Sequence, residues 1–229
     1  MANYRDAKET AIIHSRVLYA AAKLFLTKGF ENSTVKEIAA VAQVSPSTLM
    51  YIFGSKEEIL CELVKYVIEN QFKTAENLID GKTDDKMLLY AVETTLQLHM
   101  AESDESIRDL YAAAYSMPKT SEIIQHTITE KLENIFKEHL PHLETKDFYE
   151  LEIATGGVMR GFMTIPCDMY FTMERKVKRF LETNFLIYRV PDEKIEKIID
   201  FVFQFEYNSV AKNTINSMLE YLGNRLEAD

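Results

Sequence analysis

Apolar residues recur three or four positions apart through most of this 229-residue chain, and this is the period of an amphipathic helix. The pattern predicts a first helix over 10–28 and, after Ser55, one long helix that ends near residue 80. Strand-like alternation is missing over any useful length, so an all-α fold is expected. Further helices are predicted over 84–101, 105–116, 120–139, 146–164, 171–188 and 192–222, with Pro118, Pro141, Pro166 and Pro191 between them.

Residues 34–58 depart from this simple pattern, because capping signals divide them into two short helices and the start of a third. Thr34 and Glu37 predict a reciprocal capping box, in which each side chain bonds the backbone amide of the other residue. After a tight turn, Ser45 predicts the N-cap of the second short helix. The first position of that helix is Pro46, where a missing amide proton does no harm. Two short helices around a tight turn are typical of a helix-turn-helix.

The second short helix carries small side chains at its leading end. Pro46, Ser47 and Thr48 are small or hydroxylated, whereas Leu49 and Phe53 lie four apart and are expected to face inward. Small side chains at this end allow a helix backbone to approach base edges in the major groove. The pattern therefore indicates a helix that reads DNA.

Four consecutive pieces of the chain carry a resemblance to a known family. They are AAAKLFLTKGF at 20–30, STVKEIA at 33–39, VSPSTLMYIF at 44–53 and SKEEIL at 55–60. In this order and spacing the chain resembles the TetR family of bacterial transcriptional regulators. The resemblance implies a three-helix DNA-binding domain over 1–56, with its recognition helix at about 46–52. A larger helical ligand-binding and dimerisation bundle is implied over 57–229.

The same resemblance implies a sequence-specific regulator, usually a homodimeric repressor, that a small molecule releases from its operator. The operator would be a palindromic DNA duplex, because two heads read half-sites one helical turn, ~34 to 36 Å, apart. An activator or a global regulator of the same fold without a small-molecule inducer is the alternative. A helical enzyme or an interaction protein is a remote one, and Glu152, Asp168 and Glu174 would be the carboxylates to inspect for it.

The chain departs from the family pattern at the turn and at the end of the recognition helix. Gln43 stands where the family usually has glycine, so a residue with a Cβ is expected at positive φ. Met50 and Ile52 stand where the family usually has an aromatic residue and a histidine, so phosphate contacts should depend more on Tyr51 and Lys56. The residues expected at DNA are Thr34, Lys36, Ser45, Pro46, Ser47, Thr48, Tyr51 and Lys56.

The charge of the chain is divided unevenly along its length. The formal net charge is −10, but residues 1–56 carry seven Lys or Arg and four Asp or Glu. A basic head on an acidic body suits a protein whose phosphate contacts are confined to one end. An acidic body can also be nothing more than a solvated surface.

Close helix packing is predicted around the segment TGGVMRGF at 155–162, because Gly157 and Gly161 fall four apart on one helix face. By the family resemblance, helices over 150–163 and 194–222 build the dimer interface, although ordinary core packing would give the same pattern. The candidate interface residues are Gly157, Gly161, Ile198, Val202, Phe203 and Val210.

Methionine and tyrosine are frequent on the middle helices, and such side chains could line a pocket for a largely apolar effector. The candidate pocket residues are His99, Met100, Tyr111, Tyr115, Met159, Phe162 and Met163. A stripe of this kind is also what a plain helical core contains, and a satisfied core histidine would explain His99 equally well.

Several classes of protein are excluded by what the sequence lacks. It contains no glycine-rich phosphate loop, serine elbow, HExxH or paired cysteine motif, so no enzyme activity and no cofactor are expected. His139 and His142 flank a proline that spoils helical ligand spacing, so no metal site is expected. With no hydrophobic leader, two isolated cysteines and no long apolar stretch, the protein is expected in the cytoplasm without a membrane span.

Overall fold

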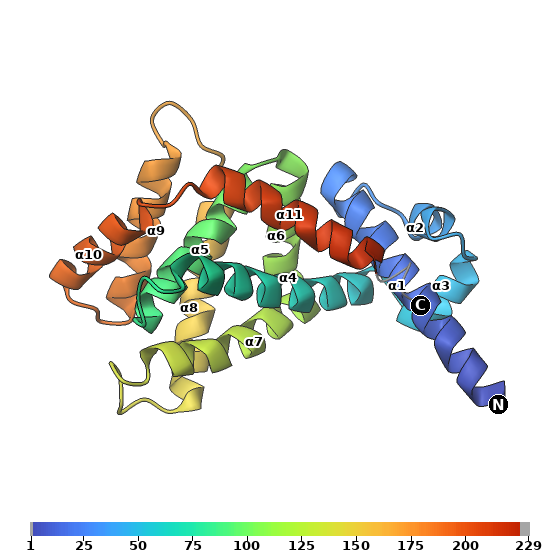
Figure 1. The fold of residues 1–229 in the computed structure, drawn as a ribbon, viewed down its shortest axis with the longest axis horizontal. Coiled ribbons are helices and arrows are strands. Elements are labelled where there is room, and N and C mark those ends of the chain that lie inside the picture. Colours follow the sequence, from blue (N-terminus) through green and yellow to red (C-terminus); the bar gives the residue numbers. More distant parts are fainter. Residues whose placement is uncertain (1, 225–229) are drawn as a thin grey trace.

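The computed structural model describes residues 2–224, and within them the chain forms eleven helices and no strand (Figure 1). The all-α prediction is confirmed. We call the first three helices the head: α1 (Ala2–Lys28), α2 (Val35–Val41) and α3 (Pro46–Phe53). The remaining helices form the body: α4 (Lys56–Ile79), α5 (Lys86–Glu102), α6 (Glu105–Ser116), α7 (Pro118–Phe136), α8 (Thr145–Thr164), α9 (Met173–Ile187), α10 (Asp192–Val202) and α11 (Tyr207–Asn224).

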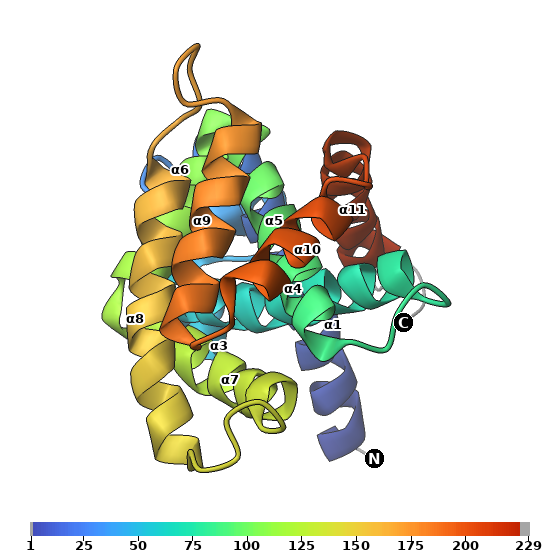
Figure 2. The same ribbon diagram turned by 90° about the vertical axis from the view of Figure 1, so that its left-hand side faces the viewer.

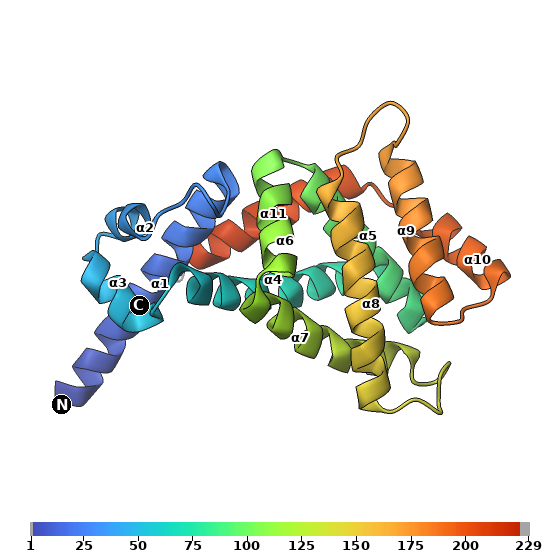
Figure 3. The ribbon, with the colours of Figure 1, turned by 180° about the vertical axis from the view of Figure 1, so that it is seen from behind.

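The head lies at one end of the long axis of the molecule, and α4 leads from it into the body (Figures 1 and 3). In the body α4 packs against α5, α7 and α11. The first helix also reaches beyond the head, because α1 packs against α6 and α11 as well as against α2. Two continuous helices therefore connect the head to the body.

The centre of the body is α5, which packs against α4 and against every helix from α6 to α11. Every residue from Tyr90 to Leu98 is buried, and this run contains the polar side chains of Glu93, Thr94, Thr95 and Gln97. A helix surrounded in this way is normally apolar on all sides. The outer face of the body opposite the head is formed by α8, α9 and α10 (Figure 2).

The prediction of one helix over 192–222 is wrong, because a turn over 203–206 divides it into α10 and α11. In this turn the amide of Gln204 bonds the carbonyl of Phe201, 3.2 Å away, and the amide of Phe205 bonds that of Val202, 3.3 Å away. Neither glycine nor proline marks the turn, and apolar side chains continue at helical spacing through it. Periodicity alone therefore could not reveal the break.

The other predicted helices are present, with boundaries that shift by a few residues. The predicted segment 105–116 agrees with α6 at both ends, whereas α1 begins at Ala2 rather than near Thr10. The helix predicted from 120 begins two residues earlier, with Pro118 at its first position, where proline costs no hydrogen bond. Within residues 2–224 no helix is both long and apolar enough to cross a membrane.

Candidate nucleic-acid interface and effector cavity

The capping box at the start of α2 is present in the structure. The Glu37 amide donates to Thr34 Oγ1 at 3.2 Å, and the Thr34 amide donates to Glu37 Oε2 at 2.9 Å. Lys28 Nζ lies 2.5 Å from Glu37 Oε1. The bond from Lys28, followed by those from Thr34, lowers the pKa of Glu37 to about 2. The carboxylate therefore stays ionised and keeps the helix start closed at any physiological pH.

The turn between α2 and α3 contains Gln43 with φ 54°, as the departure from glycine predicted. Arg16 of α1 donates through one guanidinium nitrogen to both the carbonyl oxygen and Oε1 of Gln43, each 3.2 Å away. These bonds offset the strain of a side chain in the left-handed region. The sequence reasoning missed Arg16, because its position 27 residues earlier gave no local signal.

Residues that point away from the head occupy one side of α3. Ser45 caps this helix by accepting from the Thr48 amide at 3.0 Å, while Leu49 and Phe53 are buried beneath it. The opposite side exposes Pro46, Ser47 and Met50 to solvent, and Tyr51 is 91% exposed. A short helix with buried anchors and an uncovered outer side can enter a groove without rearrangement of the head.

The hydroxyl groups at the leading end of α3 bond one another. Ser45 Oγ lies 2.8 Å from Ser47 Oγ and 2.7 Å from Thr48 Oγ1. Of the other predicted DNA contacts, Thr34 and Lys36 are exposed at α2. Their contact with DNA stays a prediction.

Lys56, at the start of α4, has intramolecular partners that the sequence reasoning did not foresee. Its ammonium donates to the carbonyl oxygens of Phe30 at 2.7 Å and Ser33 at 2.9 Å, and it stands 4.0 Å from the centroid of the Phe30 ring. Partial burial lowers the pKa of Lys56. The side chain therefore joins the loop that follows α1 to the start of α4, and a phosphate contact stays a prediction.

Two further contacts join the head to α4 and the body. The His14 ring stacks on Phe53 with centroids 4.6 Å apart, and its Nε2 lies 2.9 Å from Glu62 of α4. Lys119, at the start of α7, forms an ion pair with Glu58 in the first turn of α4. The beginning of α4 thus contacts both parts of the molecule.

An apolar cavity of about 90 Å³ lies in the body next to this connecting helix. The α4 side chains that line it include Leu60, Val64 and Ile68, and α1 contributes Ala22 and Leu26. Side chains from α5, α6, α7 and α11 complete the wall. The two helices that lead to the head therefore both border the cavity.

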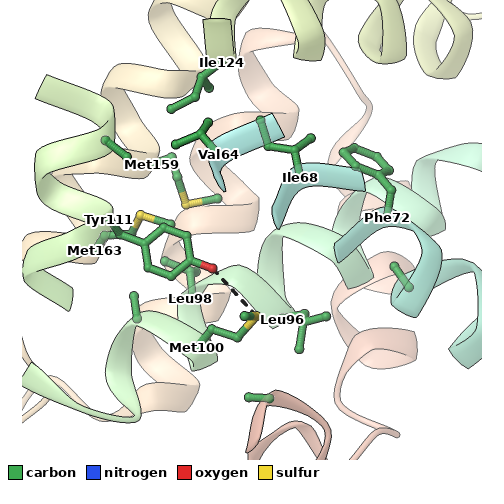
Figure 4. Close-up of a cluster of buried hydrophobic side chains, with 14 of the residues drawn as sticks. Val64, Ile68, Phe72, Leu96, Leu98, Met100, Tyr111, Ile124, Met159 and Met163 are labelled. Atoms are coloured by element: carbon green, nitrogen blue, oxygen red, sulfur yellow. Dashed lines mark hydrogen bonds between the residues drawn. The ribbon is translucent and has the colours of Figure 1, made fainter. Parts of the chain in front are cut away.

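Three of the predicted pocket residues line this cavity, namely Met100, Tyr111 and Tyr115. Tyr111 donates to the Met100 sulfur, 3.7 Å away, and Figure 4 shows the Tyr111 hydroxyl group pointing towards that sulfur. Met159 and Met163 are buried in the same cluster but do not line the cavity, so they pack as core (Figure 4).

The other two predicted pocket residues lie elsewhere. His99 bonds Asn208, with Nδ1 and Oδ1 3.1 Å apart, and stacks on Tyr207. Burial is the main cause of a lowered His99 pKa. Phe162 packs against Phe171 and Phe180. Both side chains therefore have the satisfied core partners that the alternative interpretation described.

A second pocket, of about 170 Å³, is polar and lies between α7 and α8. Its lining includes Glu152, Gln125 and Arg160, and it shares Tyr115 and Ile124 with the apolar cavity. The two spaces are therefore neighbours with a common wall. The sequence reasoning considered Glu152 only as a possible enzyme carboxylate and gave no role to this pocket.

The predicted dimer residues fall into two groups. Gly157 and Gly161 are exposed on α8, where Ile153 is 50% exposed, and a Cβ at either glycine would meet no atom within 4 Å. Ile198 and Val202 are buried in the core of their own protomer. The apolar face of α10 is thus explained by ordinary packing, as the alternative held.

The last two predicted dimer residues belong to neither group, because Phe203 is exposed beyond the end of α10 and Val210 is half-buried on α11.

Within the described residues, no three His, Cys, Asp or Glu side chains lie close enough together to hold a metal ion. Of the three carboxylates named for an enzyme, Asp168 accepts from the backbone amides of Tyr170 and Phe171 in an exposed loop. Asp168 therefore has a structural role in that loop.

Comparison with known proteins agrees with this geometry. Residues 17–63 match the family model described as bacterial regulatory proteins, tetR family. The HTH-type transcriptional regulator YerO of Bacillus subtilis (strain 168) is 24% identical over 186 residues, which are 77% of this chain and 63% of that protein. The HTH-type transcriptional repressor KstR2 of Rhodococcus jostii (strain RHA1) is 28% identical over 81 residues, or 35% of this chain and 40% of that protein.

Two solved structures have a similar fold. RolR, crystallised with resorcinol, superposes with a TM-score of 0.65 at 16% identity, covering 84% of this chain and 95% of that one. Thermus thermophilus FadR, described as a TetR-family repressor in complex with lauroyl-CoA, gives 0.56 at 17% identity, covering 77% and 93%. At such identities the likeness concerns the fold alone. The matches to curated relatives span less than two thirds of the length of those proteins.

Proposed function

We propose that the chain, whose residues 17–63 match the model of the TetR family of bacterial regulatory proteins, is a homodimeric repressor of that family, released from its operator by a small molecule. Its working compartment would be the cytoplasm, where the operator is. The DNA-binding domain would comprise residues 1–56, and residues 57–229 would bind the effector and the second protomer.

One observation carries this proposal: the exposed helix α3 is followed, after only Gly54 and Ser55, by the helix that lines the cavity. A molecule that enters the cavity must press on Leu60, Val64 or Ile68, which lie within four turns of the joint. A shift of α4 would then reorient α3, because Lys56 and Glu62 bind α4 to the head. The α1 wall of the cavity offers a second route.

Such a mechanism needs little energy. An effector must prefer the released arrangement over the operator-bound one by only about 1–3 kcal/mol per site to change operator affinity by a useful factor. Neither arrangement has to unfold. The structure has a cavity in the body, and this supports an effector-responsive protein over a regulator without an inducer.

At the DNA, the proposal assigns two kinds of contact. Ser47 and Thr48 would lie near base edges, because they occupy the leading end of α3. Phosphate contacts would come from Thr34, Ser45 and Tyr51, together with basic side chains of residues 1–56. The remaining candidates, Lys36, Pro46 and Lys56, flank these residues.

Dimerisation would use the exposed faces of α8 and α9, which lie side by side on the outer face of the body (Figure 2). The exposed side of α8 carries Gly157 and Gly161 next to the apolar Ile153, and Leu186 on α9 is 57% exposed. Small residues on a helix let a second helix approach closely, and exposed apolar side chains give the contact its driving force.

The fold neighbours support a pocket of this general kind. RolR was crystallised with resorcinol, a small aromatic molecule, and FadR with lauroyl-CoA, whose acyl chain is apolar. A largely apolar effector would suit the apolar cavity of this chain.

The proposal can be tested with one variant and its control. Gly157→Arg adds a bulky cation where the protomer has open space, so the protomer should fold while the dimer is blocked. Ser116→Arg makes the same charge change on α6. Wild type and Ser116→Arg should sediment as dimers and bind a selected operator duplex with strong salt dependence. Gly157→Arg should sediment as a monomer and bind that duplex at least ~10-fold more weakly, because one head reads one half-site. Failure of the wild type to bind any duplex would contradict the proposal.

A further inference from the structure

Two carboxyl groups lie in the interior of the body without an ion-pair partner in residues 2–224. Glu93 of α5 is 3% exposed, and Glu152 of α8 is 4% exposed. Glu152 Oε2 accepts from Thr155 Oγ1 at 3.1 Å, whereas no described residue bonds Oε1, and Glu93 forms no hydrogen bond with the described chain. Burial raises the pKa of each group to about 8. Such groups are costly to leave unmatched, because a buried charge without compensation is strongly unfavourable.

The two carboxyl groups act electrostatically on the same tyrosines. Burial is the main cause of the raised pKa of Tyr90 and of Tyr115; Tyr188 raises the pKa of Tyr90 further, and both carboxyl groups raise the pKa of both phenols. The charge of Glu93 also raises the pKa of Glu152. The other groups facing the pair are Tyr111 of α6, Tyr188 at the end of α9, Thr155 of α8 and Lys131 of α7.

Lys131 compensates this negative charge only in part. It lowers the pKa of Glu93, but its ammonium stands over the ring of Phe72, 4.2 Å from the centroid. Burial still dominates, so the pKa of Glu93 stays high. A cation brought by a ligand would therefore find carboxylates that the protein leaves unpaired.

Space for such a ligand lies beside Glu152. This carboxyl group lines the polar pocket of about 170 Å³, and Tyr115 and Ile124 separate that pocket from the apolar cavity. Gly156 keeps the position next to Glu152 open, because a Cβ there would lie 3.1 Å from Oε1. An acidic space and an apolar space thus adjoin across two side chains.

We propose that the effector is a lipophilic cation, an amine or quaternary ammonium compound whose charge is held by Glu152 in the polar pocket and whose apolar body occupies the neighbouring cavity. Glu93, which lines neither space, would add to the negative potential at Glu152. This inference rests on the proposed function, since it names the chemical class that acts on the same body. The carboxylate of Glu152 supplies the charge, and Tyr115, which lines both spaces, supplies an aromatic ring that can attract a cation.

Other ligand classes fit the site less well. An anion would be repelled by two carboxylates, and Arg160, which also lines the polar pocket, is exposed and forms no ion pair with Glu152 in the described chain. A neutral hydrogen-bond acceptor would need protonated carboxyl groups. Its binding would therefore weaken as pH rises through 8, whereas binding of a permanent cation would strengthen.

The test uses probes of matched shape on the full-length protein. Isothermal titration calorimetry would compare the permanent cation benzyltrimethylammonium with neutral acetophenone and anionic phenylacetate at pH 6.5 and 8.5. The cation should bind at least ~10-fold tighter than either other probe at pH 8.5, and its affinity should rise ~10-fold between the two pH values. It should also release protons near pH 7, measurable from buffers with different ionisation enthalpies. Equal or weaker binding of the cation, or affinity that falls with pH, would overturn the proposal.

Matched variants separate the carboxylates from general packing. Glu152→Gln and Glu93→Gln keep the side-chain shape and remove the charge, and Glu130→Gln makes the same change at an exposed position of α7. Glu152→Gln should lower the affinity for the cation at least ~10-fold, and Glu93→Gln should lower it by a smaller factor. Each variant should reduce the rise of affinity with pH, because only one ionisable carboxyl group remains, while Glu130→Gln should leave affinity and pH dependence unchanged. If both buried variants bind the cation as wild type does, the proposal fails. Should one buried variant fail to fold, the other variant and the proton release of the wild type decide.

A measurement of duplex binding in the absence of the three probes separates this inference from the proposed function. If the protein binds a duplex with salt dependence but does not bind the cation, only the cation inference is overturned. Cation binding by a protein that binds no duplex would overturn only the repressor proposal.

Discussion

The polar groups described in the head have hydrogen-bond partners, whereas several buried polar groups of the described body have none. In the head and at its junction with α4, the polar side chains at the turn and helix starts have partners: Thr34 with Glu37, Arg16 with Gln43, and Lys56 with two carbonyl groups. In the described body, several buried polar atoms have none, namely Gln71 Oε1, Thr95 Oγ1, both amide atoms of Asn184, and Tyr207 OH. The unpaired carboxyl groups of Glu93 and Glu152 belong to the same region.

This contrast bears on function. A reading head must hold its helix in one geometry whether or not a ligand is present, and satisfied local bonds achieve this. A receptor body can instead keep buried polar groups unmatched, at a cost to stability, so that a ligand supplies their partners. Mutations should therefore act on the two regions in opposite directions.

The largest effect is expected from removing an anchor of the head. Leu49→Ala removes a fully buried side chain beneath α3, and it should lower the free energy of unfolding by about 2–5 kcal/mol. The adjacent Met50 is 43% exposed, so Met50→Ala should change it by only about 0.5 kcal/mol. Chemical denaturation of both variants measures this difference. Equal losses would mean that α3 is not anchored as described.

Removal of a buried carboxyl group in the body should instead raise the free energy of unfolding. The pKa of Glu93 is raised from 4.5 to about 8, so the unfolded chain loses this proton at lower pH than the folded protein. The raised pKa of Glu93 therefore takes nothing from the free energy of unfolding well below pH 4.5. The loss grows as pH rises from 4.5 towards 8. Glu93→Gln should raise the free energy of unfolding at pH 8 by about 1–4 kcal/mol, and by much less at pH 4.5.

Denaturation curves of Glu93→Gln and wild type across this pH range provide the measurement. The exposed Glu130→Gln is the control, and it should show no comparable trend. A gain for Glu93→Gln that is the same at every pH would show that folding does not raise the pKa of Glu93.

A smaller effect on DNA recognition should distinguish base contacts within the head. Thr48→Ala should change preference at one base position by about 1–3 kcal/mol, because a base contact carries sequence information. Binding to substituted duplexes, one position at a time, measures this preference. An equal loss at every position would mean that Thr48 only supports the Ser45 cap, to which its hydroxyl is bonded at 2.7 Å.

The smallest effects should come from two lysines that differ in their partners, Lys36 in the head and Lys56 at the start of α4. Lys36→Ala removes an exposed cation, so it should weaken binding to all duplexes alike and reduce the salt slope by about one unit without loss of stability. Lys56→Ala should also lower the free energy of unfolding by about 1 kcal/mol or more, because two hydrogen bonds to carbonyl groups are lost. An unchanged salt slope for Lys56→Ala would make it a structural tether alone.

Local sequence signals were enough to predict the helix caps and the turn of the head. The caps at Thr34 and Ser45 and the positive φ at Gln43 each depend on neighbours within a few residues, and all three are present. The intramolecular role of Lys56 was not readable, because its partners lie 23 and 26 residues away.

For the body, the sequence predicted the helices but not which surfaces pack against one another. Its helices follow from periodicity, but the same period that marks a buried helix face does not say which surface covers it. The apolar residues Ile198 and Val202 could therefore suggest a dimer contact although they pack in their own protomer. Likewise, nothing around Glu93 in the sequence shows that α5 is enclosed on all sides.

The most direct test of the account is selection of bound sequences from a random duplex pool by the full-length protein. The account predicts enrichment of a palindrome whose half-site centres lie one helical turn, ~34 to 36 Å, apart. The same selection with Ser47 and Thr48 both replaced by alanine should lose preference at the positions read by α3. No enriched sequence, or an enriched sequence that this double variant recovers unchanged, would contradict the claim that α3 is the helix that reads DNA.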